Sequence, residues 1–273
     1  MYKKKKIMTY AALTLISVVF LIPLYYTIIN SLRPLYTPQV CFPKKIVFSN
    51  YKLAVTLIPF GRYLKNSLTI VSISLVLGVF VNFFYGYAFA RIKVKGNGFW
   101  FMLTLAQMMI PAIAMQIPQY ILYSKLGIRD TYWIWVINGL AGSPFTIFLY
   151  RQYMMSIPKE IEEAAVIDGC SYVSMIPRIF MPMCKSVMAI VVFNTFMGNW
   201  GDYMTPFMYL SQKKYPLSLA LFGVNYTLPQ NPNVALGPVK NAAALLLAIP
   251  VFAVFFLCQK QLVAGVTAGS VKG

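Results

Sequence analysis

Long apolar runs separated by short polar segments dominate the chain, and six of them approach or exceed the roughly 20 residues that a helix needs to cross a bilayer. The fifth run is interrupted only by Asp202. The pattern predicts an all-α integral membrane protein, a single transmembrane domain over 1–273, with six transmembrane helices at about 8–32, 64–91, 97–124, 131–153, 184–211 and 241–260.

The amino end indicates how the first predicted helix is oriented. Lysines occupy positions 3–6, directly before an apolar run longer than the roughly 7–15 residues of a signal-peptide core. We therefore interpret this run as a retained span, with its basic flank in the cytoplasm. Because six spans return the chain to its starting side, both termini are expected to be cytoplasmic.

Composition supports the membrane class and excludes others. The chain is 59% hydrophobic and 11% charged, whereas a soluble domain carries about 25% charged residues. Its net charge of +18 comes from small Lys and Arg groups between apolar runs, so it does not indicate a nucleic-acid partner.

Catalytic and cofactor signatures are missing from the sequence. There is no histidine, and the four cysteines show no C-x-x-C spacing, so no metal site and no catalytic residue are predicted. No Gly-Lys dipeptide occurs, which excludes a Walker A loop. We expect that this chain binds no cofactor itself and is not an enzyme.

Prolines occur inside the third and fourth predicted spans. Pro111 and Pro118 lie in the third and Pro144 in the fourth. Such breaks are tolerated where neighbouring helices or water satisfy the freed carbonyls, which often occurs beside a transport pathway, and a simple kink is the alternative. The segments 33–62 and 213–240 are rich in proline or amide residues and are expected to be outer loops with at most short helical pieces.

One inner loop, 154–182, carries four of the six acidic residues of the chain. Carboxylates at Glu160, Glu162 and Glu163 suit the first turns of a helix, and Gly169 suits its end, because glycine adopts the left-handed cap geometry. Ser171 is expected to cap a second short helix that presents Tyr172, Met175 and Ile176. An acidic ridge beside exposed apolar side chains favours a basic protein partner over an amphipathic loop on lipid, which would be Lys- and Arg-rich.

The residues of this loop resemble a known motif. The segment Glu163-Ala164-Ala165-Val-Ile-Asp168-Gly169, followed at its spacing by Ile179-Phe-Met-Pro182, is similar to the EAA loop of permease subunits in binding-protein-dependent ABC importers. Met181 stands where leucine is usual. The segments 63–68, 87–91, 127–132 and 199–202, and the ending 265–273, resemble the carbohydrate branch, in particular the maltose G-type permease.

That resemblance implies a type I ABC importer permease fold in a bacterial or archaeal cytoplasmic membrane. It implies pairing with a second homologous permease, two copies of a cytoplasmic ATPase that use ATP and Mg²⁺, and an extracytoplasmic solute-binding protein. ATPase contacts would come from Glu163, Ala164, Ala165, Asp168, Gly169, Tyr172, Ile179 and Pro182. The tail, 261–273, would be flexible and would reach the ATPases through Thr267, Gly269 and Lys272.

A polar group on the fifth predicted span is a candidate for the substrate pathway. It comprises Asn199, Trp200, Asp202 and Tyr203. An ionisable residue at membrane depth is a functional-site hypothesis, and sugars favour aromatic faces beside amide and carboxylate groups. In the alternative interpretation Asp202 pairs with a neighbouring helix and Trp200 anchors at the membrane interface.

Two further alternatives concern the function. The resemblance predicts import of a sugar or oligosaccharide, and a phosphorylated polyol such as glycerol phosphate is the second solute class. A membrane enzyme or secondary transporter working alone is the alternative from another class. It would need catalytic or ion-coupling groups inside the spans, where Asp202 is the only acidic residue.

Overall fold

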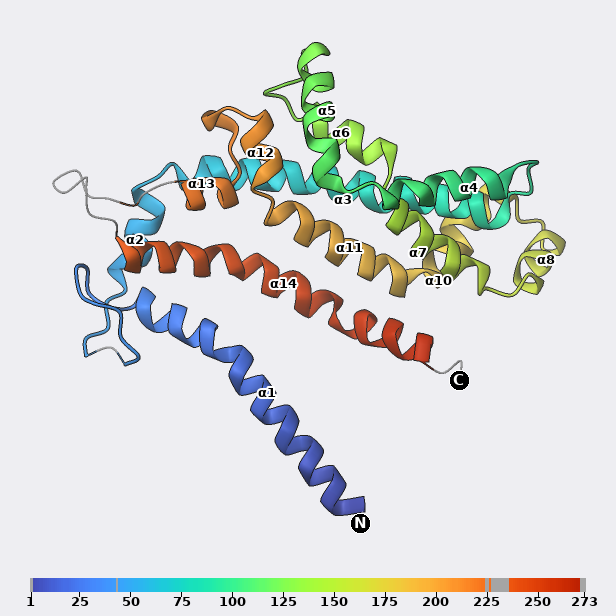
Figure 1. Cartoon of the computed structure of the whole chain (residues 1–273). Coiled ribbons are helices and arrows are strands. Elements are labelled where there is room, and N and C mark those ends of the chain that lie inside the picture. Colours follow the sequence, from blue (N-terminus) through green and yellow to red (C-terminus); the bar gives the residue numbers. More distant parts are fainter. Residues whose placement is uncertain (1, 43, 224–225, 227–235, 271–273) are drawn as a thin grey trace. The chain divides into compact units, whose positions relative to one another are not determined.

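The computed structural model describes residues 2–42, 44–223, 226 and 236–270. Two compact units divide the chain, Met1–Tyr63 with Ala220–Pro250 and Leu64–Leu219 with Val251–Gly273. The helical elements in chain order (Figure 1) are α1 (Tyr2–Ser31), α2 (Ser49–Thr56), α3 (Phe60–Arg91), α4 (Asn97–Ala106), η1 (Gln107–Met109), α5 (Ala112–Lys125), α6 (Trp133–Ala141), α7 (Pro144–Met155), α8 (Glu160–Ile167), α9 (Tyr172–Met175), η2 (Ile176–Phe180), α10 (Met181–Met183), α11 (Lys185–Trp200), α12 (Met204–Tyr209), η3 (Gln212–Lys214), α13 (Leu217–Gly223) and α14 (Gly237–Ser270).

Most of these helices belong to segments that could span a membrane. Among the described residues, four segments are long and apolar enough to cross a bilayer: α1, α3, α6 with α7, and α14. Two bent pairs of helical segments, one bent by 99° at Pro111 and one by 78° at Cys184, bring the number to six if each pair is one span. The all-helical membrane class expected from the apolar runs is confirmed.

Helix breaks are the main difference from the predicted spans. The third span, expected as one helix over 97–124, is interrupted where Ile110 is extended, because the ring of Pro111 disfavours helical geometry in the preceding residue. The fourth, expected over 131–153, is divided by Gly142 at φ +81°, and Pro144 then begins α7. Pro118, by contrast, lies inside a continuous α5.

The last two spans also differ from expectation at their ends. The helix predicted over 184–211 ends at Trp200, and α12 begins only at Met204, so Asp202 and Tyr203 lie in the break instead of on the helix. The sixth, expected to end near residue 260, continues as α14 to Ser270. Small residues such as Ala264 and Ala268 sustain helix there, so the expected flexible tail is wrong as far as Ser270.

The core of the second unit lies between α3, α7 and the start of the fifth span. Phe83 packs edge-to-face on Tyr150 at 5.4 Å between ring centroids, and Tyr87 packs on Phe180 at 5.0 Å. A Cβ on Gly86 would lie 2.5 Å from the Cβ of Tyr150. Glycine therefore permits the close approach of α3 and α7, as small residues do between membrane helices.

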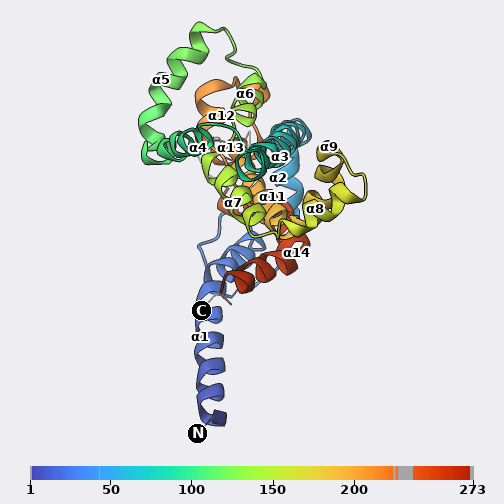
Figure 2. The same cartoon turned by 90° about the vertical axis from the view of Figure 1, so that its right-hand side faces the viewer.

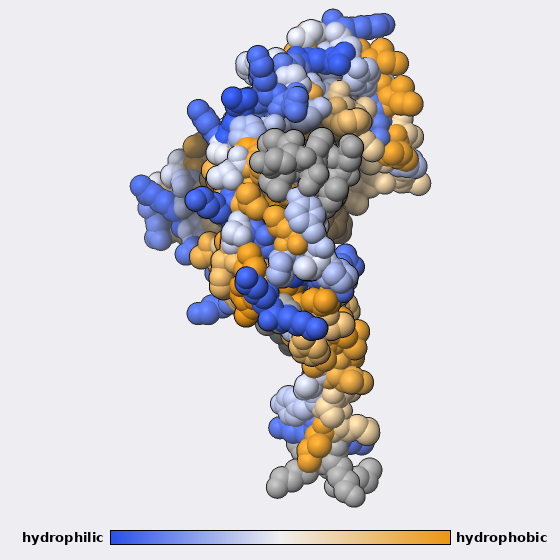
Figure 3. All heavy atoms as spheres, turned by 90° about the vertical axis from the view of Figure 1, so that its left-hand side faces the viewer, coloured by the Kyte–Doolittle hydropathy of each residue, from blue (hydrophilic) through white to orange (hydrophobic). Residues whose placement is uncertain are grey.

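The first unit contains the amino-terminal span and the outer segment behind it. Apolar side chains cover much of α1 (Figure 3), and Ile16, Phe20 and Leu21 are exposed, as expected for a surface that meets lipid or another subunit. The buried Asn50 amide of α2 donates to the carbonyl oxygens of Ser31 and Arg33 at 2.7 and 2.8 Å. Those bonds hold α2 against the end of α1.

Candidate functional site

The motif loop, residues 154–182, folds as two short helices joined at a glycine. Gly169 has φ +78°, its N–H bonds the Val166 carbonyl at 3.0 Å, and the N–H of Cys170 bonds the Ala165 carbonyl at 2.8 Å. This is the Schellman arrangement, which satisfies the free carbonyls at the end of α8. Ser171 then caps α9, since its Oγ accepts from the Ser174 N–H at 3.3 Å. The helix–glycine–helix geometry predicted from the sequence is confirmed.

The predicted contact residues of this loop differ in how far they are exposed. Ala165 is buried and Ile179 half-buried, whereas Glu163, Ala164, Asp168, Gly169, Tyr172 and Pro182 are exposed. Met175, expected to be presented at the surface, is fully buried against the core around Phe180, so that expectation is wrong. The exposed apolar side chains of this part of the loop also include Val166, Ile167 and Val173, which the sequence did not indicate.

These exposed side chains form one candidate docking surface. Ile167 is 85% exposed, Val173 77% and Tyr172 67%, and all three lie within five positions of Asp168, which is itself exposed. Figure 2 shows α8 and α9 next to each other at the edge of the second unit. Apolar groups gathered on an exposed, acidic loop are typical of a protein contact surface.

An internal ion pair anchors the loop to the rest of the second unit. Arg91, the last residue of α3, places Nη1 2.5 Å from Oε1 of Glu162 on α8. Its Nη2 donates to the carbonyl oxygens of Met154 at 2.5 Å and Ile157 at 2.8 Å, and its guanidinium lies 5.3 Å from the centroid of the Phe180 ring. The guanidinium thus connects α3, the end of α7, α8 and η2.

Sequence reasoning did not assign these two residues. The sequence indicates Glu162 only as one of several helix-start carboxylates, and Arg91 only as the basic end of the second predicted span and as part of a segment that resembles the family. Arg91 lies 71 positions before Glu162, as their numbers show, and no local pattern pairs them. A single arginine at the end of an apolar span and a carboxylate one position before the motif glutamate were the available signals.

A polar cavity of about 370 Å³ lies between α3, α6, α7 and α11. Its lining is almost entirely polar, small or aromatic: Ser74, Gly78, Asn82, Trp135, Asn138, Gly139, Gly142, Ser143, Phe145, Thr146, Asn194, Thr195, Asn199, Asp202 and Thr205. On α3, α6 and α11 the lining positions recur at helical spacing, for example 74, 78 and 82 on α3, so each of these helices contributes one face. This spacing was readable in the sequence and was missed.

Asn199 and Asp202 line this cavity, but the two aromatic residues predicted beside them do not. Asn199 Oδ1 accepts from Ser74 Oγ at 2.8 Å, and its amide donates to the Thr195 carbonyl at 2.8 Å. Trp200 is buried and stacks on Phe196 at 5.4 Å, and Tyr203 stacks on Phe207 at 5.7 Å. The structure therefore brings together two of the four predicted pathway residues.

Asn82 holds the helix break that shapes one wall of the cavity. Its Oδ1 accepts from the Ser143 N–H at 2.7 Å, and its amide donates to the Gly78 carbonyl at 2.5 Å. A Cβ on Gly142 would lie 3.1 Å from that Oδ1. Because the asparagine satisfies a backbone group freed by the break between α6 and α7, irregular backbone is tolerated at this depth.

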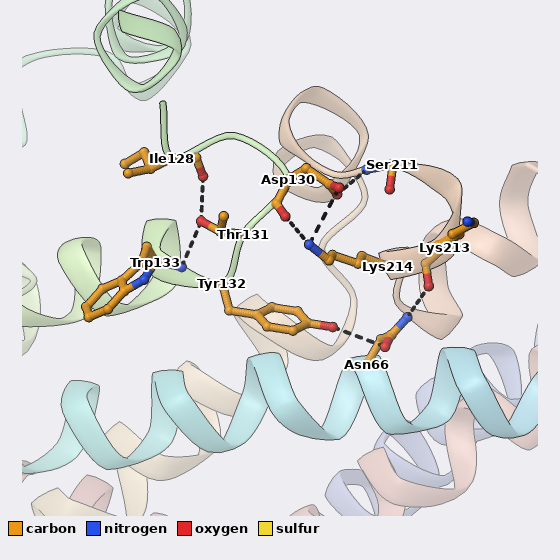
Figure 4. Close-up of polar contacts among 9 residues, drawn as sticks. All are labelled: Asn66, Ile128, Asp130, Thr131, Tyr132, Trp133, Ser211, Lys213 and Lys214. Carbon is orange, nitrogen blue, oxygen red and sulfur yellow. Dashed lines mark hydrogen bonds and ion pairs between the residues drawn. The ribbon is translucent and has the colours of Figure 1, made fainter. Parts of the chain in front are cut away.

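A network around Asp130 connects three segments near the amino-terminal part of α3 (Figure 4). The Asp130 carboxylate accepts from the Ser211 N–H at 2.9 Å, and Lys214 donates to the Asp130 carbonyl and lies 3.5 Å from its carboxylate. Asn66 accepts from the Tyr132 hydroxyl at 3.1 Å and donates to the Lys213 carbonyl at 3.1 Å. The bond from Ser211, aided by Lys214, holds the pKa of the Asp130 carboxyl below its usual value.

The predicted tail contacts are only partly covered by the structure. Thr267 and Gly269 lie in the last turns of α14, whose backbone is helical there, and Lys272 lies outside the described residues.

Known proteins are similar to this chain over most of its length. Residues 74–267 match the model of the family described as "Binding-protein-dependent transport system inner membrane component". The chain is 30% identical to the maltodextrin transport system permease protein MdxG of Bacillus subtilis, over 98% of this chain and 96% of that protein. It is also 30% identical to the melibiose/raffinose/stachyose import permease protein MelC of the same organism, over 99% and 98% of the two chains.

The fold has a solved counterpart. A chain from the crystal structure of a bacterial ABC transporter that imports the acidic polysaccharide alginate superposes with a TM-score of 0.81, covering 94% of this chain and 95% of that one at 23% identity. At this identity the likeness establishes the shared fold.

Proposed function

Because the chain belongs to the binding-protein-dependent transport system inner membrane components, we propose that it is the permease subunit through which an ABC importer moves an oligosaccharide into the cell. Members of this family are multi-pass, non-catalytic proteins of the cytoplasmic membrane, they work with a solute-binding protein, and ATP is bound by their ATPase partners. The solute class is supported by relatives named for maltodextrin, melibiose, raffinose and stachyose.

In this proposal the motif loop transmits movement from the ATPase. Glu163 and Asp168, with the apolar Ile167, Tyr172 and Val173, dock into a cleft of a cytoplasmic ATPase subunit that offers basic residues. Ala164 lies exposed next to Glu163 and leaves room for close approach, and Gly169 keeps the bend. Arg91 then passes the displacement of α8 to α3 and α7, since it belongs to α3 and its guanidinium contacts Glu162 on α8 and the Met154 carbonyl on α7.

The proposed assembly has two different permease subunits, two copies of the ATPase and one external binding protein. The polar cavity supports a transport pathway, because polar side chains at membrane depth face water or protein and not lipid. Asn199 and Asp202 are the predicted pathway residues that this cavity retains. A phosphorylated polyol is the second candidate solute, whereas family membership argues against a protein that works alone.

Charge reversal at the loop tests the proposal in the complex reconstituted in proteoliposomes. Glu163→Lys is expected to leave membrane insertion intact, to release the ATPase and to reduce uptake of a radiolabelled oligosaccharide to background. Lys44→Glu reverses one exposed charge in the predicted outer segment and serves as the control, with uptake unchanged. Normal uptake by the Glu163→Lys complex would show that this loop does not couple transport to ATP.

A further inference from the structure

We infer that the polar cavity admits uncharged, hydroxyl-rich solutes and disfavours anionic ones. The inference rests on the proposed function and narrows it, because oligosaccharide importers include one for an acidic polysaccharide whose permease has this fold. It is argued from the charges, free hydrogen-bonding groups and aromatic surface that line the cavity.

The cavity lining carries an acidic side chain and no basic one. Among its fifteen residues Asp202 alone is ionisable, and neither lysine nor arginine lines the cavity. A uronate or phosphate group entering this space would lose hydration without meeting a cationic partner, and it would approach a carboxylate of like charge. Uncharged solutes avoid both costs.

Uncharged hydrogen-bonding groups are plentiful in the same lining. In the described part of the chain, the side chains of Thr146, Asn194 and Thr205 have no hydrogen-bond partner. Asn138 Oδ1 accepts from the Tyr123 hydroxyl at 2.6 Å, while its amide N–H groups donate to no acceptor among the described residues. Hydroxyl and carboxamide groups both donate and accept, which matches the hydroxyls of a sugar that do the same.

Other polar side chains of the cavity lining already form hydrogen bonds within the protein. Asn82 accepts from the Ser143 N–H at the α6–α7 break and donates to the Gly78 carbonyl on α3, and Asn199 is held between Ser74 and Thr195. These two asparagines shape the cavity, so the free groups of Thr146 and Asn194 are the ones available to a passing solute.

Size and aromatic surface agree with a saccharide. A volume of about 370 Å³ falls within the roughly 300–1,000 Å³ of small-molecule sites. Phe145 lines the cavity and is 46% exposed, so an apolar ring is available to the C–H face of a sugar. The cavity also lies within the depth of a bilayer core of roughly 30 Å, since its α3 residues, from Asn82 to Ser74, are about 14 to 25 Å along the helix from Arg91.

The test uses the purified complex of this chain with its partner permease and ATPases. Uptake into proteoliposomes is first measured for neutral maltotetraose, stachyose and arabinotetraose, and for anionic tetragalacturonate and glycerol 3-phosphate. Direct binding is then measured without the binding protein, because that protein imposes a selection of its own. A neutral oligosaccharide is expected to bind at least about tenfold more tightly than either anion, a difference of about 1.4 kcal/mol.

Variants locate this preference in the cavity. Thr146→Val and Asn194→Leu remove free polar groups at similar volume, and together they are expected to weaken neutral-solute binding about tenfold or more. Thr69→Val on α3 is the matched control, because that hydroxyl bonds the Lys65 carbonyl outside the cavity. Asn194→Lys adds a cation to the wall and is expected to shift the preference toward tetragalacturonate.

The outcomes separate the two proposals. If the wild-type complex takes up none of the five solutes, the proposed function fails. If it takes up a neutral saccharide while the Thr146→Val/Asn194→Leu variant binds it normally, or if it binds an anion as tightly, this inference is overturned and the importer function stands.

Discussion

The guanidinium of Arg91 lies 2.5 Å from the carboxylate of Glu162, and this ion pair ties the end of a transmembrane helix to the first helix of the motif loop. The neighbouring Glu163, the glutamate of the motif itself, is exposed. Adjacent carboxylates therefore have different roles, one internal and one facing outward, as expected when successive helix positions point about 100° apart.

Breaking the internal pair should destabilise the protein. Both side chains are largely buried, at 6% and 19% exposure, so Glu162→Gln leaves a buried guanidinium without its counter-charge and should cost about 3 kcal/mol. A lowered Tm of the detergent-solubilised chain would be measured. Glu163→Gln is the matched control and should leave Tm unchanged, and equal shifts in the two variants would refute the division of roles.

Arg91→Gln supplies a second measurement on the same contact. It also loses the bonds to the Met154 and Ile157 carbonyls, so it should destabilise at least as much as Glu162→Gln. The double variant should lose less stability than the sum of the losses of the two single variants, because the two residues contact each other. Strict additivity would indicate that the pair does not interact in the membrane.

Gly169 should tolerate no side chain, for reasons of backbone geometry alone. A Cβ there would meet nothing within 4 Å, but the residue has φ +78°, so Gly169→Ala should cost about 1–2 kcal/mol through left-handed strain. Gly61→Ala is the control, since it also adds a Cβ to open space but lies at ordinary helical geometry. Chemical denaturation compares them, and a neutral Gly169→Ala would mean that the bend is not fixed.

Close packing of α3 on α7 gives a third prediction. The Cβ of Gly86→Ala would lie 2.5 Å from the Tyr150 Cβ and 3.2 Å from the Arg151 nitrogen, so the helices must separate, at a cost of about 2 kcal/mol. Gly98→Ala on α4 meets nothing within 4 Å and should be neutral or stabilising by up to about 1 kcal/mol. The order of the two Tm values checks this, and a stable Gly86→Ala protein would contradict the packing.

Acid should weaken the network around Asp130. Because the Ser211 N–H and Lys214 lower the pKa of this carboxyl in the folded protein, its stabilising contribution is complete above the usual aspartate pKa, about 3.9. It is lost as pH falls through the folded-state pKa. Wild type should therefore lose its Tm advantage over Asp130→Asn between about pH 5 and strongly acidic pH, and a constant difference across that range would refute the link.

The sequence by itself determined the membrane class and the local shape of the motif loop. Apolar runs of span length admit few alternatives to a transmembrane helix, because backbone polar groups must be satisfied within the bilayer. Gly169 and Ser171 specified the bend and the second cap through their own backbone and side-chain chemistry, and both appear in the structure as expected.

Only the tertiary structure decided which residues meet. Met175 lies two positions after the exposed Val173 and is nevertheless buried, because it packs in one core cluster with Phe180. Trp200 and Tyr203 flank polar residues but stack on other rings, while Ser74, Asn138 and Thr146 reach the cavity from other helices. Arg91 finds Glu162 across 71 positions, the difference of their numbers, and such pairings depend on how helices pack and not on local propensity.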